Sequence, residues 1–75
     1  MDRPVKAFAE RLELAARHVE EGKAVVERQK KLVRQRVTNG WDAAESQATL
    51  EAFERILASF EDDLAAIKGQ MQQSS

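Results

Sequence analysis

The chain has 75 residues, of which 33% are charged and 43% hydrophobic, and its formal net charge is −1. It contains no cysteine, which excludes disulfides and thiolate metal sites. A transmembrane helix needs about 20 consecutive apolar residues, and charged residues interrupt every apolar stretch, including the N-terminal one where a signal peptide has its apolar core. We therefore expect one small cytoplasmic domain of bacterial type, with little core of its own.

Residues 3–38 are predicted to form one long helix. Apart from Gly22, the stretch is rich in good helix formers such as Ala, Glu, Arg, Lys and Leu. Apolar or small residues recur in it at alternating spacings of three and four, the 3.5-residue repeat of a seam between two long helices. The seam positions are Val5, Phe8, Leu12, Ala15, Val19, Gly22, Val26, Gln29 and Val33.

Residues 39–41 are predicted to form the turn. Gly40 should adopt the left-handed conformation just past the end of the first helix. Asp42 and Glu45 have the spacing of a capping box, in which the Asp42 carboxylate accepts from the Glu45 amide and the Glu45 side chain reaches back to the Asp42 amide. A link this short makes the two helices antiparallel neighbours.

A second helix is predicted over residues 42–70, followed by a frayed tail over 71–75. Folding the chain about the turn sets the small Gly22 opposite Leu57, as close packing requires. Lys23 should then meet Glu54 across one flank, and His18 should meet Asp63 across the other. The seam positions of this helix are Leu50, Phe53, Leu57, Phe60, Leu64, Ile67 and Met71.

Charge agrees with this pairing of the helices. Residues 1–38 hold ten Lys and Arg against six Asp and Glu, whereas residues 39–75 hold two against seven. Two halves of opposite charge attract each other when they lie side by side. The spacing of the apolar residues, the match of small to large residues at the seam and the opposite charges of the two halves agree with one another. Together they predict an all-α protein, an antiparallel two-helix hairpin with coiled-coil-like packing.

No residue set predicts catalysis or ligand binding. His18 is the single histidine, and Leu14 and Gly22, one helical turn away on either side, are not metal ligands. The acidic residues 61–63 lack the oxygen spacing of a calcium loop. We therefore expect no enzyme activity, no cofactor, no metal and no small-molecule substrate.

Residues 28–36 form a basic run in which five of nine side chains are cationic. Such clusters occur in nucleic-acid-binding proteins. Cations near a helix C-terminus are also favoured by the helix dipole, and no aromatic residue interrupts the run. The run therefore has a structural explanation as well as a functional one, and nucleic-acid binding through residues 28–36 is the alternative function.

Apolar residues also lie beside the seam, where a two-helix coiled coil in water normally carries charges. They predict that the hairpin buries this flank against a second copy, which gives a homodimer with the form of a four-helix bundle. The predicted function is that of a non-enzymatic protein-interaction or assembly module. The rival interpretations are a monomer with scattered exposed apolar residues and a flank that binds another protein. The predicted interface residues are Leu14, Val25, Leu32, Ala52 and Ile56.

Four stretches of the chain resemble a group of small bacterial helical-hairpin proteins of similar length. The resemblance covers most of residues 15–65, and these relatives commonly have His where this chain has Trp41. It implies a freestanding bacterial hairpin, and because the group has no assigned activity it implies no functional residues. The stretches are Arg17-His18-Val19-Glu20-Glu21-Gly22, Val26-Glu27-Arg28-Gln29, Gly40-Trp41-Asp42 and Leu50-Glu51-Ala52-Phe53-Glu54.

Overall fold

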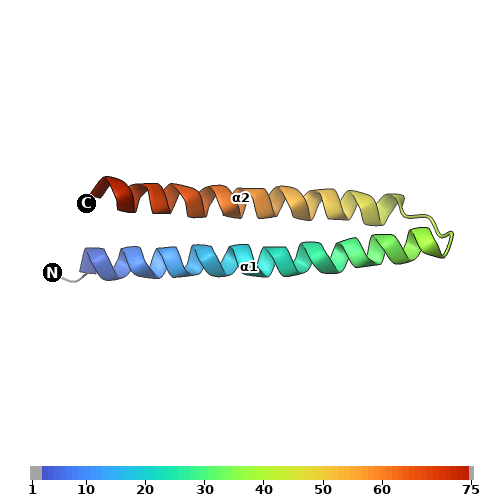
Figure 1. Cartoon of the computed structure of the whole chain (residues 1–75), viewed down its shortest axis with the longest axis horizontal. Helices are drawn as coiled ribbons and strands as arrows, with labels where there is room; N and C mark the ends of the chain where they lie inside the picture. Colours follow the sequence, from blue (N-terminus) through green and yellow to red (C-terminus); the bar gives the residue numbers. More distant parts are fainter. Residues whose placement is uncertain (1–2, 75) are drawn as a thin grey trace.

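The computed structural model describes residues 3–74, and the side chains of residues 6–70 and 72. It consists of two helices, α1 (Arg3–Thr38, 36 residues) and α2 (Ala44–Ser74, 31 residues). The helices run antiparallel and side by side, so the start of α1 and the end of α2 lie at one end and the turn at the other (Figure 1). The molecule measures 60 × 16 × 14 Å. The predicted all-α hairpin is thus confirmed.

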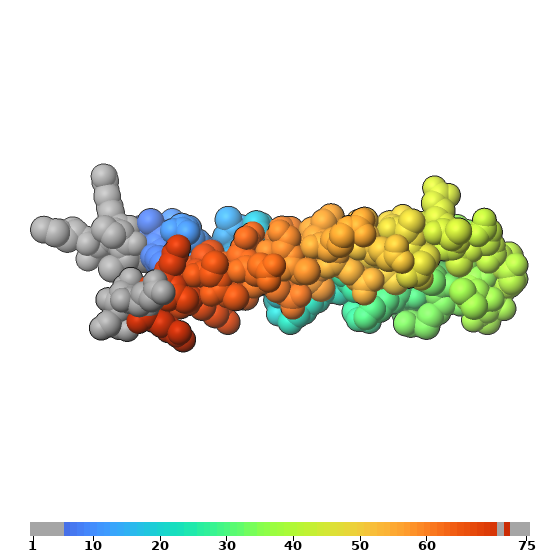
Figure 2. Space-filling view, turned by 90° about the horizontal axis from the view of Figure 1, so that it is seen from above, coloured from blue at the N-terminus to red at the C-terminus, as the bar shows by residue number. Residues whose placement is uncertain are grey.

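The core of the hairpin is a narrow line between the helices. Its buried apolar side chains, Ala15, Val19, Val26 and Leu50, all occupy predicted seam positions. Figure 2 shows α1 emerging on one side of α2 near the open end and on the opposite side toward the turn, so the two helices cross at a shallow angle. With only two helices, each seam residue is covered from one side, and the flanks remain open to solvent.

At Gly22 the first helix lies close against the side chains of the second. A Cβ atom at this position would lie 3.1 Å from Leu57 Cδ1 and 3.5 Å from Phe60 Cδ2. Separations this short leave no room for a larger side chain unless the Leu57 or Phe60 side chain moves. The predicted placement of Gly22 against Leu57 is confirmed.

The end of α1 is closed by a Schellman motif. Gly40 has φ 71°, and its amide donates to the Val37 carbonyl at 3.1 Å. The Trp41 amide donates to the Arg36 carbonyl at 2.8 Å. These two bonds satisfy carbonyls that the helix itself leaves without partners. They reverse the chain within a few residues, as predicted for Gly40.

The start of α2 differs from the predicted capping box. Asp42 Oδ1 accepts from the Ala44 amide at 2.9 Å, not from that of Glu45. The acceptor and donor are two residues apart, so the Asp42 side chain forms an Asx turn that satisfies the first amide of the helix. The Gln47 amide donates to the Ala43 carbonyl at 2.8 Å. The helix therefore begins two residues later than the predicted start at residue 42.

The C-terminal end of α2 also differs from the expectation of a frayed tail. The helix continues to Ser74, while Ser75 lies outside the described residues. Residues 70–73 are Gln, Met, Gln and Gln, all of which have good helix propensity. The single Gly69 costs only about 1 kcal/mol, too little to end the helix.

We expect Gly40→Ala to lower the free energy of unfolding by about 1–2 kcal/mol, the cost of the left-handed conformation for a residue with a Cβ. A Cβ at position 40 meets nothing within 4 Å, so only the backbone conformation is tested. Gly69→Ala is the matched control, because it also meets open space but lies inside α2, where it should stabilise. Urea unfolding measures both, and a Gly40→Ala protein as stable as the parent would contradict the expectation.

Candidate interaction surface

The two flanks of the hairpin differ in chemistry. One, here called the charged flank, carries Lys23 and Lys30 from α1 and Glu51, Glu54 and Glu61 from α2. Each set shares one helix face, because residues three, four or seven apart lie on the same side of a helix. The opposite flank, here called the apolar flank, carries the five predicted interface residues. They are Leu14, Val25, Leu32, Ala52 and Ile56.

The apolar flank remains accessible in the single chain. Leu14 is 48% exposed, Leu32 39% and Ile56 49%. Val25 and Ala52 are half-buried beside the seam. Large aliphatic side chains that stay this exposed along one side of so small a protein form a surface suited to burial against another molecule.

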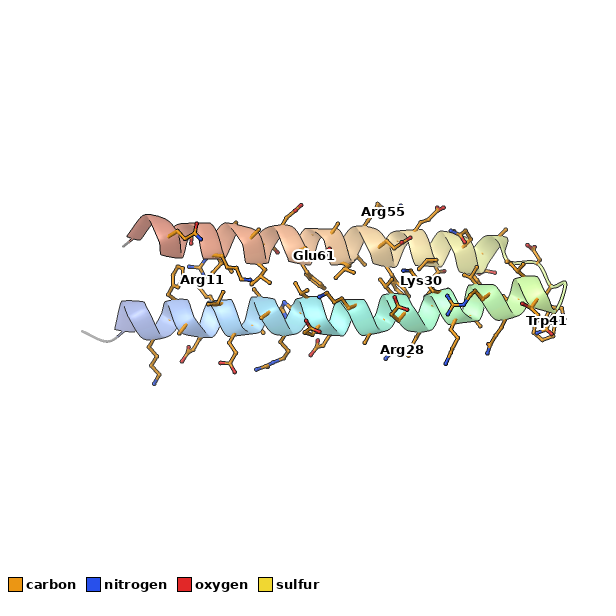
Figure 3. The ribbon with its side chains drawn as sticks, in the orientation of Figure 1. Arg11, Arg28, Lys30, Trp41, Arg55 and Glu61 are labelled. Atoms are coloured by element: carbon orange, nitrogen blue, oxygen red, sulfur yellow. The ribbon has the colours of Figure 1, made fainter. Side chains whose placement is uncertain are left out.

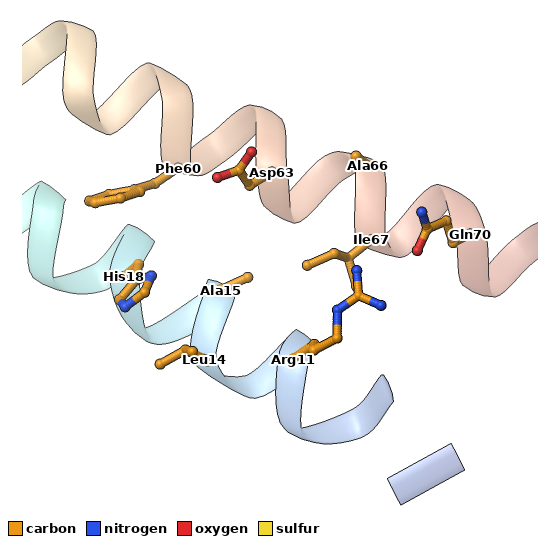
Figure 4. A pocket seen from close by; sticks show the side chains of 9 residues that line it. All are labelled: Arg11, Leu14, Ala15, His18, Phe60, Asp63, Ala66, Ile67 and Gln70. Atoms are coloured by element: carbon orange, nitrogen blue, oxygen red, sulfur yellow. The ribbon is translucent and has the colours of Figure 1, made fainter. Parts of the chain in front are cut away.

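An open hollow lies at the end of this flank where the helices start and finish. Leu14 and His18 line it from α1, and Phe60, Asp63 and Ala66 line it from α2 (Figure 4). The His18 ring stacks on Phe60, with 5.1 Å between centroids and a 34° tilt. His18 and Asp63 therefore border the same hollow, and the principal partner of the imidazole is an aromatic ring.

A second hollow lies on the same flank near the turn. Leu32 and Arg36 border it from α1, and Asp42, Glu45 and Thr49 border it from the start of α2. Arg36 Nη1 donates to the Asp42 carbonyl at 3.5 Å. Since the two hollows flank Val25 and Ile56, the apolar flank extends along most of the hairpin.

One buried polar contact was missed by sequence reasoning. Ser46 is buried, and its carbonyl accepts from Gln29 Nε2 at 2.9 Å. The spacing held a signal for it, because Ser46 lies four residues before Leu50 and so continues the seam of α2. The bond explains why a polar residue such as Gln29 occupies a seam position of α1.

Ion pairs contribute little to the pairing of the helices. Lys23 Nζ lies 3.6 Å from the Glu20 carboxylate of its own helix, and among the described residues it forms no ion pair with Glu54. In the part of the chain that the structure describes, the ion pairs all join residues within α1. A lysine reaches a carboxylate one turn away on its own helix with less loss of side-chain entropy than one on a neighbouring helix. Exposed pairs of this kind stabilise by at most about 1 kcal/mol.

The cationic side chains of the basic segment 28–36 differ in exposure and in pairing. Arg28, Lys31 and Arg34 are exposed, and Figure 3 shows Arg28 pointing away from α2. Lys30 Nζ lies 3.5 Å from the Glu27 carboxylate. Three cations of the run are therefore available at the outer side of α1.

The turn carries an exposed apolar tip formed by Val37 and Trp41. In Figure 3 the Trp41 side chain lies at the turn end of the molecule. Sequence reasoning did not single out Val37. Val37 lies one residue before the end of α1 and is 64% exposed.

Among the described residues, no three His, Asp or Glu side chains converge to hold a metal ion. No described helix is long and apolar enough to cross a membrane. Comparison of the chain with protein-family models, curated proteins and solved structures finds no match. The arguments for function therefore come from the chain's own surface.

Proposed function

We propose that this chain is a non-enzymatic assembly module, a cytoplasmic protein whose helical hairpin dimerises through the apolar flank into a four-helix bundle. The single observation that supports this most is the exposure of Leu14, Leu32 and Ile56 along one flank while charges line the other. Coiled-coil-like packing across four helices would enclose the seam residues from a second side.

The energetic argument favours burial of this flank. Fully burying one aliphatic side chain stabilises by about 1.5–3 kcal/mol, and whole domains are stable by only about 5–15 kcal/mol. A chain of 75 residues, with four buried apolar side chains among those that the structure describes, has little stability to spare. Covering three half-exposed aliphatic residues per chain therefore adds a large share of the total.

A second copy is the occupant that the surface fits best. A twofold interface buries the same patch on both partners and closes without leaving an open face. The apolar flank includes residues of both helices and extends along most of the rod, so two copies cover each other along their length. The charged flank then lies outside, where it keeps the dimer hydrated.

Sedimentation at micromolar concentration tests the proposal. The parent should sediment near twice its mass of 8.5 kDa. Ile56→Glu places an unpaired charge in the interface and should give monomer or unfolded chain. Ala58→Glu is the matched control, since Ala58 is exposed on the same helix but outside the apolar flank, and this variant should remain dimeric. A parent that sediments as a folded monomer refutes the proposal.

The exposed Arg28, Lys31 and Arg34 favour a second candidate, a nucleic-acid-associated protein. Phosphate contacts make the logarithm of affinity fall linearly with the logarithm of salt concentration. Fluorescence anisotropy of labelled single- and double-stranded DNA and RNA, with the parent and with Arg34→Glu, tests it. Binding that weakens steeply with salt and is lost in Arg34→Glu would support this function over pure assembly.

A further inference from the structure

We infer that the two copies of the dimer lie with their turns at the same end, so that α1 of each copy packs against α2 of the other. This inference rests on the proposed dimer and specifies its symmetry axis, which runs along the helices. In this arrangement the apolar flank of α1 packs against α2 of the second copy.

Twofold symmetry allows two ways to join two hairpins flank to flank. When the axis runs along the helices, both turns lie at one end, and each α1 covers the partner's α2 at the same level. When the axis crosses the helices, the turns lie at opposite ends, and α1 covers α1 while α2 covers α2. The choice depends on which helix surfaces complement each other.

The side chains of the flank are large on α1 and mostly small on α2. From α1 come Leu14, His18, Val25 and Leu32, whereas α2 contributes one large aliphatic residue, Ile56, with the polar Asp63 and Gln70 and several small residues. Close packing sets large side chains against small ones. The small flank residues of α2 are Thr49, Ala52, Ser59 and Ala66.

Residues from the two helices that border the same hollow lie at about the same position along the axis of the hairpin. Leu14 and Ala66 border one hollow, and Leu32 and Thr49 border the other. With the turns together, Leu14 meets the partner's Ala66, and Leu32 meets the partner's Thr49. With the turns apart, Leu14 meets the partner's Leu32, while Ala66 meets the partner's Thr49. That arrangement crowds one helix pair and leaves gaps in the other, and both are destabilising.

Charge favours the same arrangement by an independent route. Residues 1–38 hold ten Lys and Arg against six Asp and Glu, and residues 39–75 hold two against seven. Packing α1 on the partner's α2 brings opposite charges together, whereas α1 on α1 brings two basic helices together. Arg11, which borders the open-end hollow, then faces the acidic α2 of the partner (Figure 4).

The absence of cysteine makes the arrangement directly measurable with one spin label per chain. Thr38→Cys places the label beside the turn, and Ala24→Cys places it near the middle of α1. The two residues are exposed, fourteen positions apart and therefore on the same outer face of the helix. Sedimentation of each labelled variant reports whether it is dimeric, and pulsed electron paramagnetic resonance gives the distance between the two labels.

With the turns together, the Thr38 and Ala24 distances should be similar, because both reflect only the width of the bundle. With the turns apart, the two Thr38 labels should lie about 40 Å farther apart along the bundle axis than the two Ala24 labels, given a rise of 1.5 Å per residue, so the Thr38 distance should be much the longer. A dimer with the long Thr38 distance overturns this arrangement and leaves the proposed dimer standing. A monomeric mass with no dipolar signal at either position overturns both.

Discussion

Replacement of Gly22 by Leu should lower the free energy of unfolding, although it removes a glycine from the middle of a helix. Overpacking of a tight site costs about 1–3 kcal/mol, and replacing a helical glycine returns about 1 kcal/mol. A Cβ at Gly22 already lies 3.1 Å from Leu57 Cδ1, so the outer carbons of a leucine must push the Leu57 and Phe60 side chains out of their places. We expect the steric cost to exceed that gain, with a net loss of up to about 2 kcal/mol.

Gly69→Leu is the matched control for this change. Gly69 also lies inside a helix, but a Cβ there meets nothing within 4 Å, so only the gain in helix propensity remains. Thermal melting followed by circular dichroism should show the two variants moving in opposite directions. A melting temperature that rises in both would mean that Gly22 does not face α2 in solution.

The architecture could be predicted because it depends on signals that repeat along the chain. The three-four spacing is carried by many residues on each helix, so an error at one position does not move the seam. Gly40 needs only one property, tolerance of positive φ, and the structure has φ 71° there. Gly22 against Leu57 then follows from counting outward from the turn.

Details that depend on one side chain could not be predicted. Asp42 has two amides within reach at the start of α2, and sequence spacing does not choose between them. Lys23 likewise has carboxylates on its own helix and on the neighbouring one, and it pairs with Glu20. The free energies of such alternative contacts differ by only a fraction of a kcal/mol, because they depend on side-chain rotamers and solvation.

The candidate surface was predictable in its residues but not in its extent. Leu14, Leu32 and Ile56 stand out in the sequence because apolar residues are unusual beside a seam, and the structure leaves them exposed. The two hollows depend on how far the helices separate toward each end of the flank. Their lining combines distant positions such as Leu14 and Ala66, and only a three-dimensional register brings those together.

Two substitutions by alanine on α2, Leu50→Ala and Ile56→Ala, separate the stability of the hairpin from that of the dimer. Leu50 is 7% exposed and part of the seam, whereas Ile56 is 49% exposed on the apolar flank. Leu50→Ala should cost about 2–5 kcal/mol per chain, as for other buried leucines. Ile56→Ala should cost the isolated hairpin only about 0.5 kcal/mol, as for other surface substitutions.

Protein concentration distinguishes the two effects, because association stabilises a fold by mass action. Melting curves at low and high micromolar concentration should show a large, nearly constant loss for Leu50→Ala. The loss for Ile56→Ala should be small in dilute protein and grow with concentration, since the parent gains stability by burying Ile56 against a second copy. An Ile56→Ala loss that stays small at every concentration, with a parent whose melting temperature does not rise, would mean that no second copy covers the flank.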